Sequence, residues 1–349
     1  MIELKQEWPI PIILEAGVNH EGSLKNAFLM IDQAADLGVF SIKFQTYTAE
    51  RLAAVQSPSY WDLSKEHTDS QFALFKKYGV FRSSEYEELA HYCKEKGVVF
   101  STTFFDTDWL DELDHLVSFY KVASADITNR KLLRRILEGK KPVLLSTGAS
   151  TLKEVEAALH YSYNVDADAR ISLLHCVLNY PTQISNANLQ RIRILKENFP
   201  DLDVGYSDHT VPPHSLQAIS TAFCLGAKII ETHFTFDKTL AGNDHYHSLD
   251  FSDVSTLKDL LIQTQASLKF SEDAFIASQL DARQHARRGV YALKNIEANQ
   301  QISENALQLL RPIADGGVPS EQLGQILGKS IKYAIPAGAP IRFSDLDED

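Results

Sequence analysis

Eight short apolar runs alternate with amphipathic stretches over the first 270 residues of the chain. The runs cover residues 11–15, 39–45, 98–103, 117–124, 142–147, 171–176, 202–207 and 228–234. Such runs, separated mostly by segments of helical length, are typical of buried parallel strands, because a crossover helix must carry the chain back before the next parallel strand begins. The count of eight favours a closed (β/α)8 TIM barrel, an α/β fold, over an open doubly wound sheet, which is the alternative architecture.

The sequence pattern changes after residue 270. Residues 271–287 have the character of a partly helical linker, and residues 288–349 contain short strands and turns without the period of the barrel. We therefore expect a catalytic barrel domain over 1–270, a linker over 271–287 and a small β-rich domain over 288–349. An insertion at about 48–80 is rich in aromatic residues, which predicts an ordered excursion near the barrel rim.

Charge and composition exclude several classes of partner. The formal net charge of −12 argues against nucleic acid or an anionic membrane surface as the main partner. No apolar run approaches the length of about 20 residues that a membrane span needs, and the N-terminal residues lack a signal-peptide pattern. The cysteines are three in number and widely spaced, which is typical of reduced thiols. We expect a cytoplasmic protein with a small-molecule substrate.

Nearly every predicted strand ends in a polar or ionisable residue, although a buried strand has no packing reason to carry one. In a barrel the carboxyl ends of the strands converge on one rim, where active sites lie. Any single residue of this kind could be an isolated surface or capping residue, but the whole set predicts a polar rim. The set is Glu15, Lys43, Gln45, Thr102, Lys121, Ser124, Ser146, His175, Ser207 and His233.

Two histidines stand at the ends of neighbouring predicted strands. His209 follows the seventh run and His233 ends the eighth, so their imidazoles are expected side by side, and neutral imidazole is the commonest transition-metal ligand in proteins. Two protein ligands would leave positions open for water and substrate. The alternative is a hydrogen-bonded pair without metal. Glu15 and Asp244 are candidate carboxylates for the same site, whereas the histidines of residues 245–247 are weaker candidates that turns and caps explain equally well.

Two lysines interrupt apolar strands. An unpaired ammonium would be costly at Lys43 or Lys121, and a phosphate or carboxylate partner would offset that cost. Neighbouring hydroxyl groups would add hydrogen-bond donors at the same rim; they belong to Thr102, Ser124, Ser146 and Ser207. The competing chemistry is a Schiff base on one of the lysines, as in class I aldolases.

Motifs spread over essentially the whole chain carry a family resemblance. In order, they are EAGVNHEGSLKNA, IKFQTY, FSTTFFD, YKVASAD, LLSTGAS, LHC followed by YPT, GYSDHT, and ETHF followed by GNDH. Together they resemble the N-acetylneuraminate (sialic acid) synthase family. Three later motifs, RRGVYALKNIEANQQIS, LLRP and LGK, resemble the antifreeze-like (SAF, β-clip) domain of that family.

The resemblance implies a transferase that joins the methylene carbon of phosphoenolpyruvate to the aldehyde of an N-acetylmannosamine-like amino sugar and releases phosphate. It implies Mn²⁺ or Mg²⁺ held by His209 and His233, with Glu15 and Asp244 as acidic catalytic groups. The phosphoenolpyruvate positions it implies are Lys43, Thr102, Lys121, Ser124, Ser146 and Ser207, and the sugar positions are Gln45, Asp126, Tyr180 and Arg311. Arg311 is expected to reach into the barrel of a second subunit, which implies a domain-swapped homodimer.

Three departures from the family pattern concern the sugar. Asp126 stands where many members have Glu, Leu178 occupies a position that is usually polar, and residues 241–244 read Ala-Gly-Asn-Asp before an unusual HYHSLD. The acceptor therefore stays open between N-acetylmannosamine, a precursor of another nonulosonic acid of the legionaminic or pseudaminic type, and a phosphorylated sugar. From another class, a non-catalytic sugar-binding barrel is the alternative.

Overall fold

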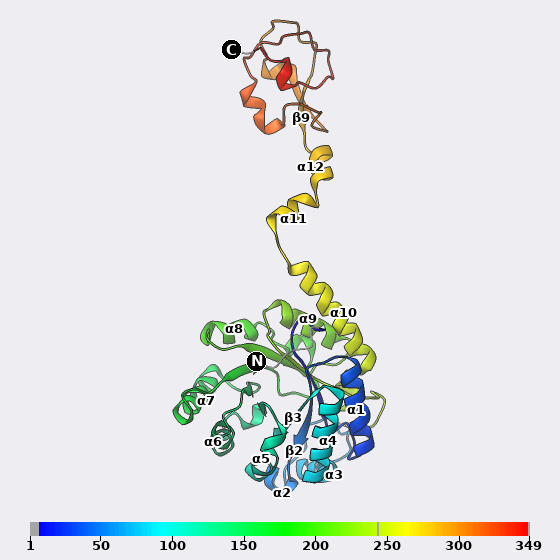
Figure 1. Ribbon diagram of the computed structural model, residues 1–349, viewed down its shortest axis with the longest axis vertical. Helices are drawn as coiled ribbons and strands as arrows, with labels where there is room; N and C mark the ends of the chain where they lie inside the picture. Colours follow the sequence, from blue (N-terminus) through cyan, green and yellow to red (C-terminus); the bar gives the residue numbers. More distant parts are fainter. Residues whose placement is uncertain (1–6, 243, 348–349) are drawn as a thin grey trace. The chain divides into compact units, whose positions relative to one another are not determined.

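The computed structural model describes residues 7–242 and 244–347, so Asn243 of the expected sugar-side segment lies outside the described residues. Eight parallel strands form a closed barrel in which each strand pairs with the next and β8 pairs with β1. The predicted TIM barrel is thereby confirmed (Figure 1). The strands are β1 Ile12–Gly17, β2 Ser41–Thr46, β3 Val99–Phe104, β4 Tyr120–Val122, β5 Val143–Ser146, β6 Ile171–His175, β7 Val204–Asp208 and β8 Ile230–His233.

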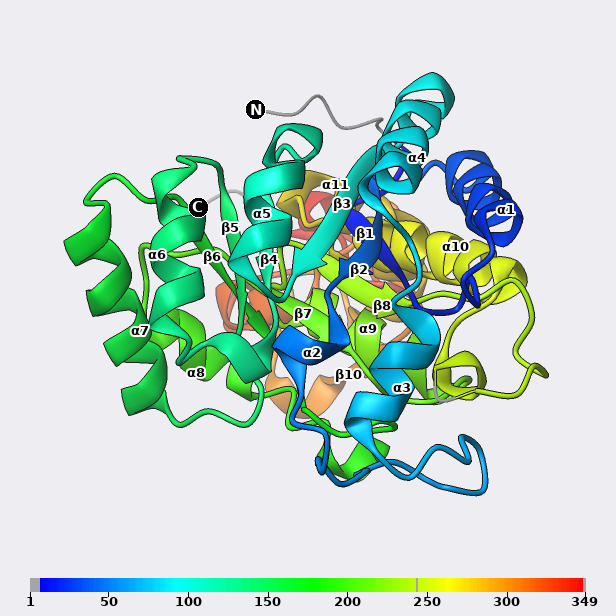
Figure 2. The same ribbon diagram turned by 90° about the horizontal axis from the view of Figure 1, so that it is seen from below.

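Each barrel strand is followed by a helix that packs outside the barrel, as Figure 2 shows for α1 and α4–α8 around the central strands. These helices are α1 Leu24–Asp36, α4 Ser83–Lys96, α5 Thr107–Leu113, α6 Arg130–Glu138, α7 Leu152–Val165, α8 Arg191–Asn198, α9 His214–Cys224 and α10 Phe251–Leu268. The insertion after β2 adds α2 Ala49–Leu52 and α3 Gln71–Tyr78. No helix in the described ranges is both long and apolar enough to cross a membrane.

Local sequence signals account for these helices. In α1 the Ser23 side chain accepts a hydrogen bond from the Asn26 N–H, and the buried residues recur at the helical spacing: Ala27, Met30, Ile31 and Ala34. A capping box between Thr151 and Glu154 begins α7. Gly97 ends α4 in the left-handed conformation, with φ of 72°.

The barrel interior changes from apolar to polar along the strand direction. The part nearer the amino ends of the strands is an apolar cluster of Ile13, Leu144 and Leu174, from β1, β5 and β6, with Phe119, which directly precedes β4. Because side chains on one face recur every second residue, the next inward positions on β1, β4 and β5 are Glu15, Lys121 and Ser146. The polar side chains therefore gather at the carboxyl ends of the strands, next to the apolar cluster, and the candidate site lies at this end of the barrel.

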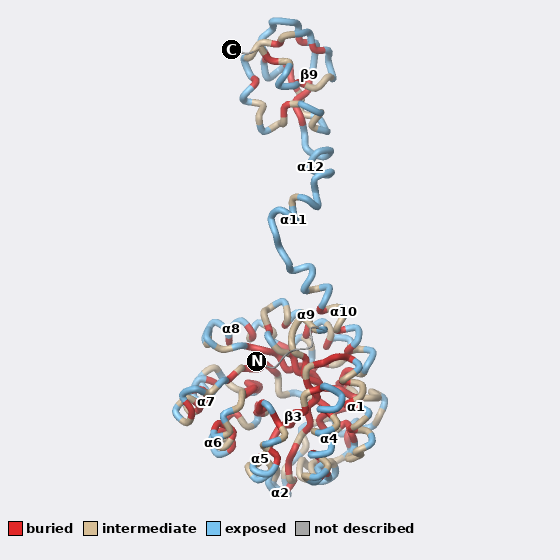
Figure 3. The backbone as a smooth tube through the Cα atoms, viewed as in Figure 1, coloured by how far each residue is buried: buried red, intermediate tan, exposed pale blue. Residues whose placement is uncertain are grey.

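The chain divides into two compact units, Met1–Ser267 and Leu268–Asp349. In the second unit, β9 Gly289–Ala292 pairs antiparallel with β10 Leu307–Leu310 over a core of its own that includes Val290, Ile296 and Ile326. The helices α11 Glu272–Ala277 and α12 Leu280–Ala286 contain no buried residue (Figure 3). Within the described residues, the 3₁₀ turns are η1 Asp114–Leu116, η2 Ser124–Asp126, η3 Ile184–Asn186, η4 His245–His247, η5 Glu304–Ala306, η6 Ser320–Gln325 and η7 Phe343–Asp345.

The close packing of the barrel interior makes a testable prediction at Gly205 in β7. A Cβ added there would lie 2.5 Å from the backbone oxygen of Ile229 and 2.6 Å from Leu174 Cδ2. Gly205→Ala should therefore overpack the barrel and lower its free energy of unfolding by about 1–3 kcal/mol, measured by urea denaturation. Gly324→Ala is the control, because no atom lies within 4 Å of its added Cβ. An unchanged midpoint for Gly205→Ala would show that the interior can relax.

Candidate active site and metal centre

A cavity of about 380 Å³ lies at the carboxyl ends of the barrel strands. The residues predicted for the rim and the site within the barrel line this cavity, except Thr102, Ser146 and His175. The lining includes Glu15, Lys43, Gln45, Lys121, Ser124, Asp126, Tyr180, Ser207, His209, His233 and Asp244. Residues far apart in the sequence thus converge on one cavity, as the rim hypothesis requires.

The two lysines meet two buried glutamates at the bottom of this cavity. Lys43 Nζ forms an ion pair with Glu15 and donates a hydrogen bond to Thr103 Oγ1 at 2.8 Å. Lys121 Nζ lies 3.4 Å from Glu231 Oε1, and Lys43 Nζ lies 3.9 Å from Glu231 Oε2. All four charged side chains are buried. We call Glu15, Lys43, Lys121 and Glu231 the charge cluster.

The two carboxylates of the charge cluster differ in acidity. Burial raises the pKa of Glu15, and the attraction of Lys43 opposes that rise only in part. Burial also acts to raise the pKa of Glu231, but Lys121, Lys43 and the hydrogen bond from Ser207 together hold that pKa below its ordinary value. Glu231 therefore stays ionised near neutral pH, while Glu15 is the carboxyl group able to exchange a proton there.

The hydroxyl groups expected around the lysines have different positions. Ser207 donates to Glu231 Oε1 at 2.9 Å, and Ser124 lies 3.1 Å from Cys176 Sγ. Thr102 pairs with Thr46 at 2.7 Å on the outer face of the sheet, whereas Thr103 contacts Lys43 and lines the cavity. The structure thus places Thr103, rather than Thr102, at the site, because adjacent strand residues point to opposite faces.

Ser146 follows Leu144 on the inward face of β5, but it does not line the cavity. Its Oγ is buried and has no hydrogen-bond partner among the described residues. A buried hydroxyl group without a partner is a donor available to a bound molecule.

The two predicted metal-binding histidines lie side by side, with ring centroids 5.4 Å apart. His209 Nδ1 lies 2.6 Å from the carbonyl oxygen of Val177. Since a carbonyl can only accept, Nδ1 carries the proton and Nε2 keeps its lone pair. Burial lowers the pKa of His209 to about 4 and that of His233 well below its ordinary value. Both imidazoles are therefore neutral at pH 7, as metal ligands must be, and the buried Nδ1 of His233 has no hydrogen-bond partner among the described residues.

The Asp244 carboxylate lies beside the histidines of the cavity. Its Oδ2 lies 3.7 Å from His233 Nδ1, and its Oδ1 lies 3.6 Å from His247 Nε2. Although burial acts to raise the pKa of Asp244, the neighbouring imidazoles hold it below its ordinary value. An ionised carboxylate beside neutral imidazoles suits a divalent cation.

Aromatic and amide side chains form the outer part of the cavity. The Tyr180 ring lies 4.3 Å from the His209 ring between centroids, and Gln45 Nε2 donates to Glu15 Oε1 at 2.8 Å. The Asp126 carboxylate accepts a hydrogen bond from Asn129, and burial raises its pKa. The insertion and the residue before it add Tyr47, Tyr60, Trp61, Phe75 and Tyr78. The predicted excursion therefore forms one wall of the site.

Arg311 lies on the second unit, directly after β10, and its side chain is exposed there. The described lining of the barrel cavity contains no arginine.

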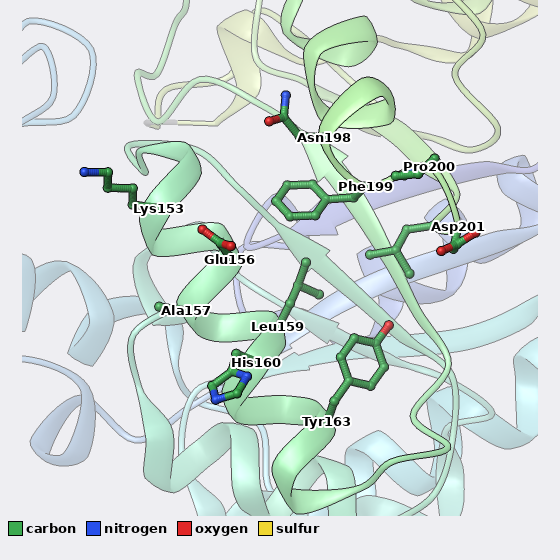
Figure 4. Close-up of a pocket in the computed structure, with 11 residues that line it drawn as sticks. Lys153, Glu156, Ala157, Leu159, His160, Tyr163, Asn198, Phe199, Pro200 and Asp201 are labelled. Atoms are coloured by element: carbon green, nitrogen blue, oxygen red, sulfur yellow. The ribbon is translucent and has the colours of Figure 1, made fainter.

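A second hollow, of about 710 Å³, lies on the helical surface between α7 and the end of α8 (Figure 4). Its lining includes Glu156, His160, Tyr163 and Phe199. Most of the residues that line this hollow are solvent-exposed, and no ion pair or metal-ligand cluster joins them among the described residues. The buried charged groups and the histidine pair lie at the barrel cavity instead, which is therefore the candidate active site.

Glu231 is the main site residue that sequence reasoning missed. It was part of the ETHF motif, two residues before His233, and alternation along the strand puts both side chains on the inward face. It is also the single acidic residue of the run 228–234. An acid two positions from a predicted ligand on the same strand was therefore a usable signal.

Comparisons with known proteins identify relatives that match nearly the whole chain. The chain is 34% identical over 323 residues to the N,N'-diacetyllegionaminic acid synthase of Campylobacter jejuni, covering 91% of this chain and 94% of that protein. It is 28% identical to the N-acetylneuraminate-9-phosphate synthase of Drosophila melanogaster, covering 95% and 94%. The crystal structure of the N-acetylneuraminic acid synthetase of Leptospira borgpetersenii matches with a TM-score of 0.68 at 32% identity, covering 79% and 92%.

Family models match both parts of the chain. Residues 287–347 match the SAF domain, in agreement with the antifreeze-like resemblance. Residues 30–272 match the NeuB family, and this match includes every barrel strand except β1. The family model covers more than half of the chain, and the chain therefore belongs to the NeuB family.

Proposed function

We propose that this protein condenses phosphoenolpyruvate with an N-acylated amino sugar to form a nonulosonic acid. In this reaction the methylene carbon of phosphoenolpyruvate forms a bond to the sugar aldehyde carbon, water adds to the enol carbon, and the C–O bond to phosphate breaks. The observation that carries the proposal is that the charge cluster and the His209–His233 pair share one cavity. The names of the relatives support the product class.

The charge cluster suits an anionic substrate. Lys43 and Lys121 are buried cations at the bottom of the cavity, where low polarity strengthens their attraction for a phosphate or carboxylate group. Ser124 lines the same cavity, and the Ser146 hydroxyl on the inward face of β5 has no hydrogen-bond partner among the described residues. Phosphoenolpyruvate therefore fits this end, with Glu15, whose pKa is raised, as the group that transfers a proton.

His209 and His233 would hold the divalent metal, with Mn²⁺ or Mg²⁺ as the ions implied by the family. When bound, the metal polarises the aldehyde of the sugar as a Lewis acid. Asp244 stays ionised next to His233 and orients water or a sugar hydroxyl group.

The outer cavity suits an uncharged sugar. Apart from histidines, Lys43 and Lys121 are the only basic residues in its described lining, and both belong to the charge cluster. A phosphorylated sugar would need a cation for its phosphate in addition to any arginine that donates to the sugar's hydroxyl and amide oxygens. Tyrosine and tryptophan rings instead offer apolar faces with polar edges, which suit an N-acetyl group and hydroxyl groups. We therefore favour an unphosphorylated 2-acetamido or 2,4-diacetamido hexose as the acceptor.

A substrate panel with phosphate detection tests the proposal. Phosphoenolpyruvate should release phosphate with N-acetylmannosamine or a 2,4-diacetamido hexose, and more slowly with N-acetylmannosamine 6-phosphate. Chelation should abolish the release, and Mn²⁺ or Mg²⁺ should restore it. No release with any sugar would contradict the proposal. Full activity of metal-free enzyme, or trapping of a lysine adduct by borohydride, would favour the Schiff-base alternative.

The charge cluster predicts opposite effects for two substitutions on phosphoenolpyruvate affinity, measured by calorimetry without sugar. Lys121→Ala should weaken binding by roughly 1.5–3 kcal/mol, because a charge-assisted hydrogen bond is lost. Glu231→Gln should bind at least as tightly as the parent protein, because it removes a negative charge from beside both lysines while keeping an acceptor for Ser207. Lys153→Ala, at an exposed position on α7, is the control. Equal weakening by both substitutions would argue against an electrostatic role.

We also propose that Arg311 of one subunit serves the barrel of another, as the resemblance of the C-terminal domain to the SAF domain of the family implies. Its guanidinium would donate several hydrogen bonds to sugar oxygens. Arg311→Ala should raise the Michaelis constant for the sugar and leave that for phosphoenolpyruvate nearly unchanged. Mixing Arg311→Ala chains with His233→Ala chains should restore activity, since a heterodimer would contain one intact site. If tagged subunits exchange without restoring activity, Arg311 serves its own barrel.

A further inference from the structure

A buried histidine that the proposed function leaves unused lies next to the metal pair. His247, on η4, has no exposed side-chain surface (0%). Neither its Nδ1 nor its Nε2 forms a hydrogen bond within the described part of the chain. The distance of 3.6 Å from Nε2 to Asp244 Oδ1 exceeds the hydrogen-bond range. A buried imidazole with both nitrogens unsatisfied is costly unless a ligand binds one of them.

The neighbours of His247 have the geometry of a metal site. One ligand atom from each of His233, Asp244 and His247 lies within 4.8 Å of the other two. The rings of His233 and His247 are 4.9 Å apart between centroids and inclined by 69°. Atoms that each lie about 2.1 Å from one ion are at most about 4.2 Å apart. Two contacts fall within that limit: Asp244 Oδ2 lies 3.7 Å from His233 Nδ1, and Asp244 Oδ1 lies 3.6 Å from His247 Nε2.

We propose that His247 is a further protein ligand of the metal, so that its imidazole and the Asp244 carboxylate join the imidazoles of His209 and His233. The inference concerns the same centre as the proposed function and rests on it for the role of the metal in the reaction. His233 and Asp244 line the cavity and His247 does not. His247 therefore binds from the side away from the cavity, which leaves the cavity side for His209, water and substrate.

This ligand set has a consequence for the choice of metal. Imidazole nitrogens favour transition metals, whereas Mg²⁺ prefers oxygen ligands and loses its water reluctantly. An added imidazole therefore shifts the site towards ions such as Mn²⁺, Fe²⁺ and Co²⁺ and away from Mg²⁺. Selectivity between these two groups of ions then depends on His247.

The test measures metal binding by chelator-treated protein without phosphoenolpyruvate or sugar. Co²⁺ is titrated by its visible absorption, and Mn²⁺ and Mg²⁺ by calorimetry. His247→Ala, and His247→Leu of similar volume, should weaken Co²⁺ and Mn²⁺ binding at least tenfold and alter the Co²⁺ spectrum. Mg²⁺ affinity should change less than twofold. The matched control is His245→Asn on the same turn, because that ring contacts Thr235 at 2.8 Å and lies outside the metal-ligand group.

The outcome against the inference is a folded His247→Leu protein with the parent's Co²⁺ affinity and spectrum. Equal weakening by His245→Asn would also overturn it, since the effect would then come from the turn. Should both His247 variants fail to fold, pulsed EPR of the Mn²⁺-loaded parent protein decides. Coupling to imidazole nitrogens of His209, His233 and His247 supports the inference, and coupling to two imidazoles overturns it. Failure of phosphate release with every sugar would overturn the proposed function and leave these binding results unaffected.

Discussion

The attraction between two lysines and two glutamates inside the barrel is the interaction on which the site depends. Lys43 and Lys121 are themselves buried, and an unpaired ammonium group at either position would cost several kcal/mol. Glu15 and Glu231 neutralise them across neighbouring strands. The charge cluster lies next to the apolar cluster of the barrel interior, on the side of the strands' carboxyl ends. The two glutamates thus stabilise the buried lysines, and these lysines are the cations that an anionic substrate entering the cavity would meet.

Closure of the barrel brings the charge cluster next to the histidine pair. In the register of the sheet, Glu15 on β1 pairs with Lys43 on one side and with His233 on the other. An open sheet would leave β1 and β8 at opposite edges and separate these groups. Because the barrel closes, one carboxyl group lies between the lysine that would bind phosphoenolpyruvate and the histidine that would bind the metal, which suits a group that transfers protons between the two reactants.

Burial shifts the pKa values in the charge cluster and in the histidine pair, in opposite directions for acids and bases. The loss of water raises the pKa of Glu15 and lowers the pKa values of His209 and His233, because it disfavours the charged form of each. One environment thus supplies a carboxyl group that can exchange a proton and imidazoles that keep their lone pairs. Glu231 and Asp244 are exceptions, since neighbouring lysines or imidazoles keep them ionised in spite of burial.

The sequence by itself determined the barrel, its polar rim and the histidine pair, because alternation of apolar runs with helices and the position of a residue at a strand end are local properties. Tertiary structure decided which side chains face the cavity. The run 98–103 contains Thr102 and Thr103 in succession, and a shift of one residue exchanges the two faces, so only the register with β2 selects Thr103. Glu231 could have been found from its spacing to His233. His247 was one of the weaker candidates of residues 245–247, and the sequence could not separate it from His245. Its position beside Asp244 and His233 depends on how the turn after β8 folds back over the strand ends, which no periodic pattern encodes.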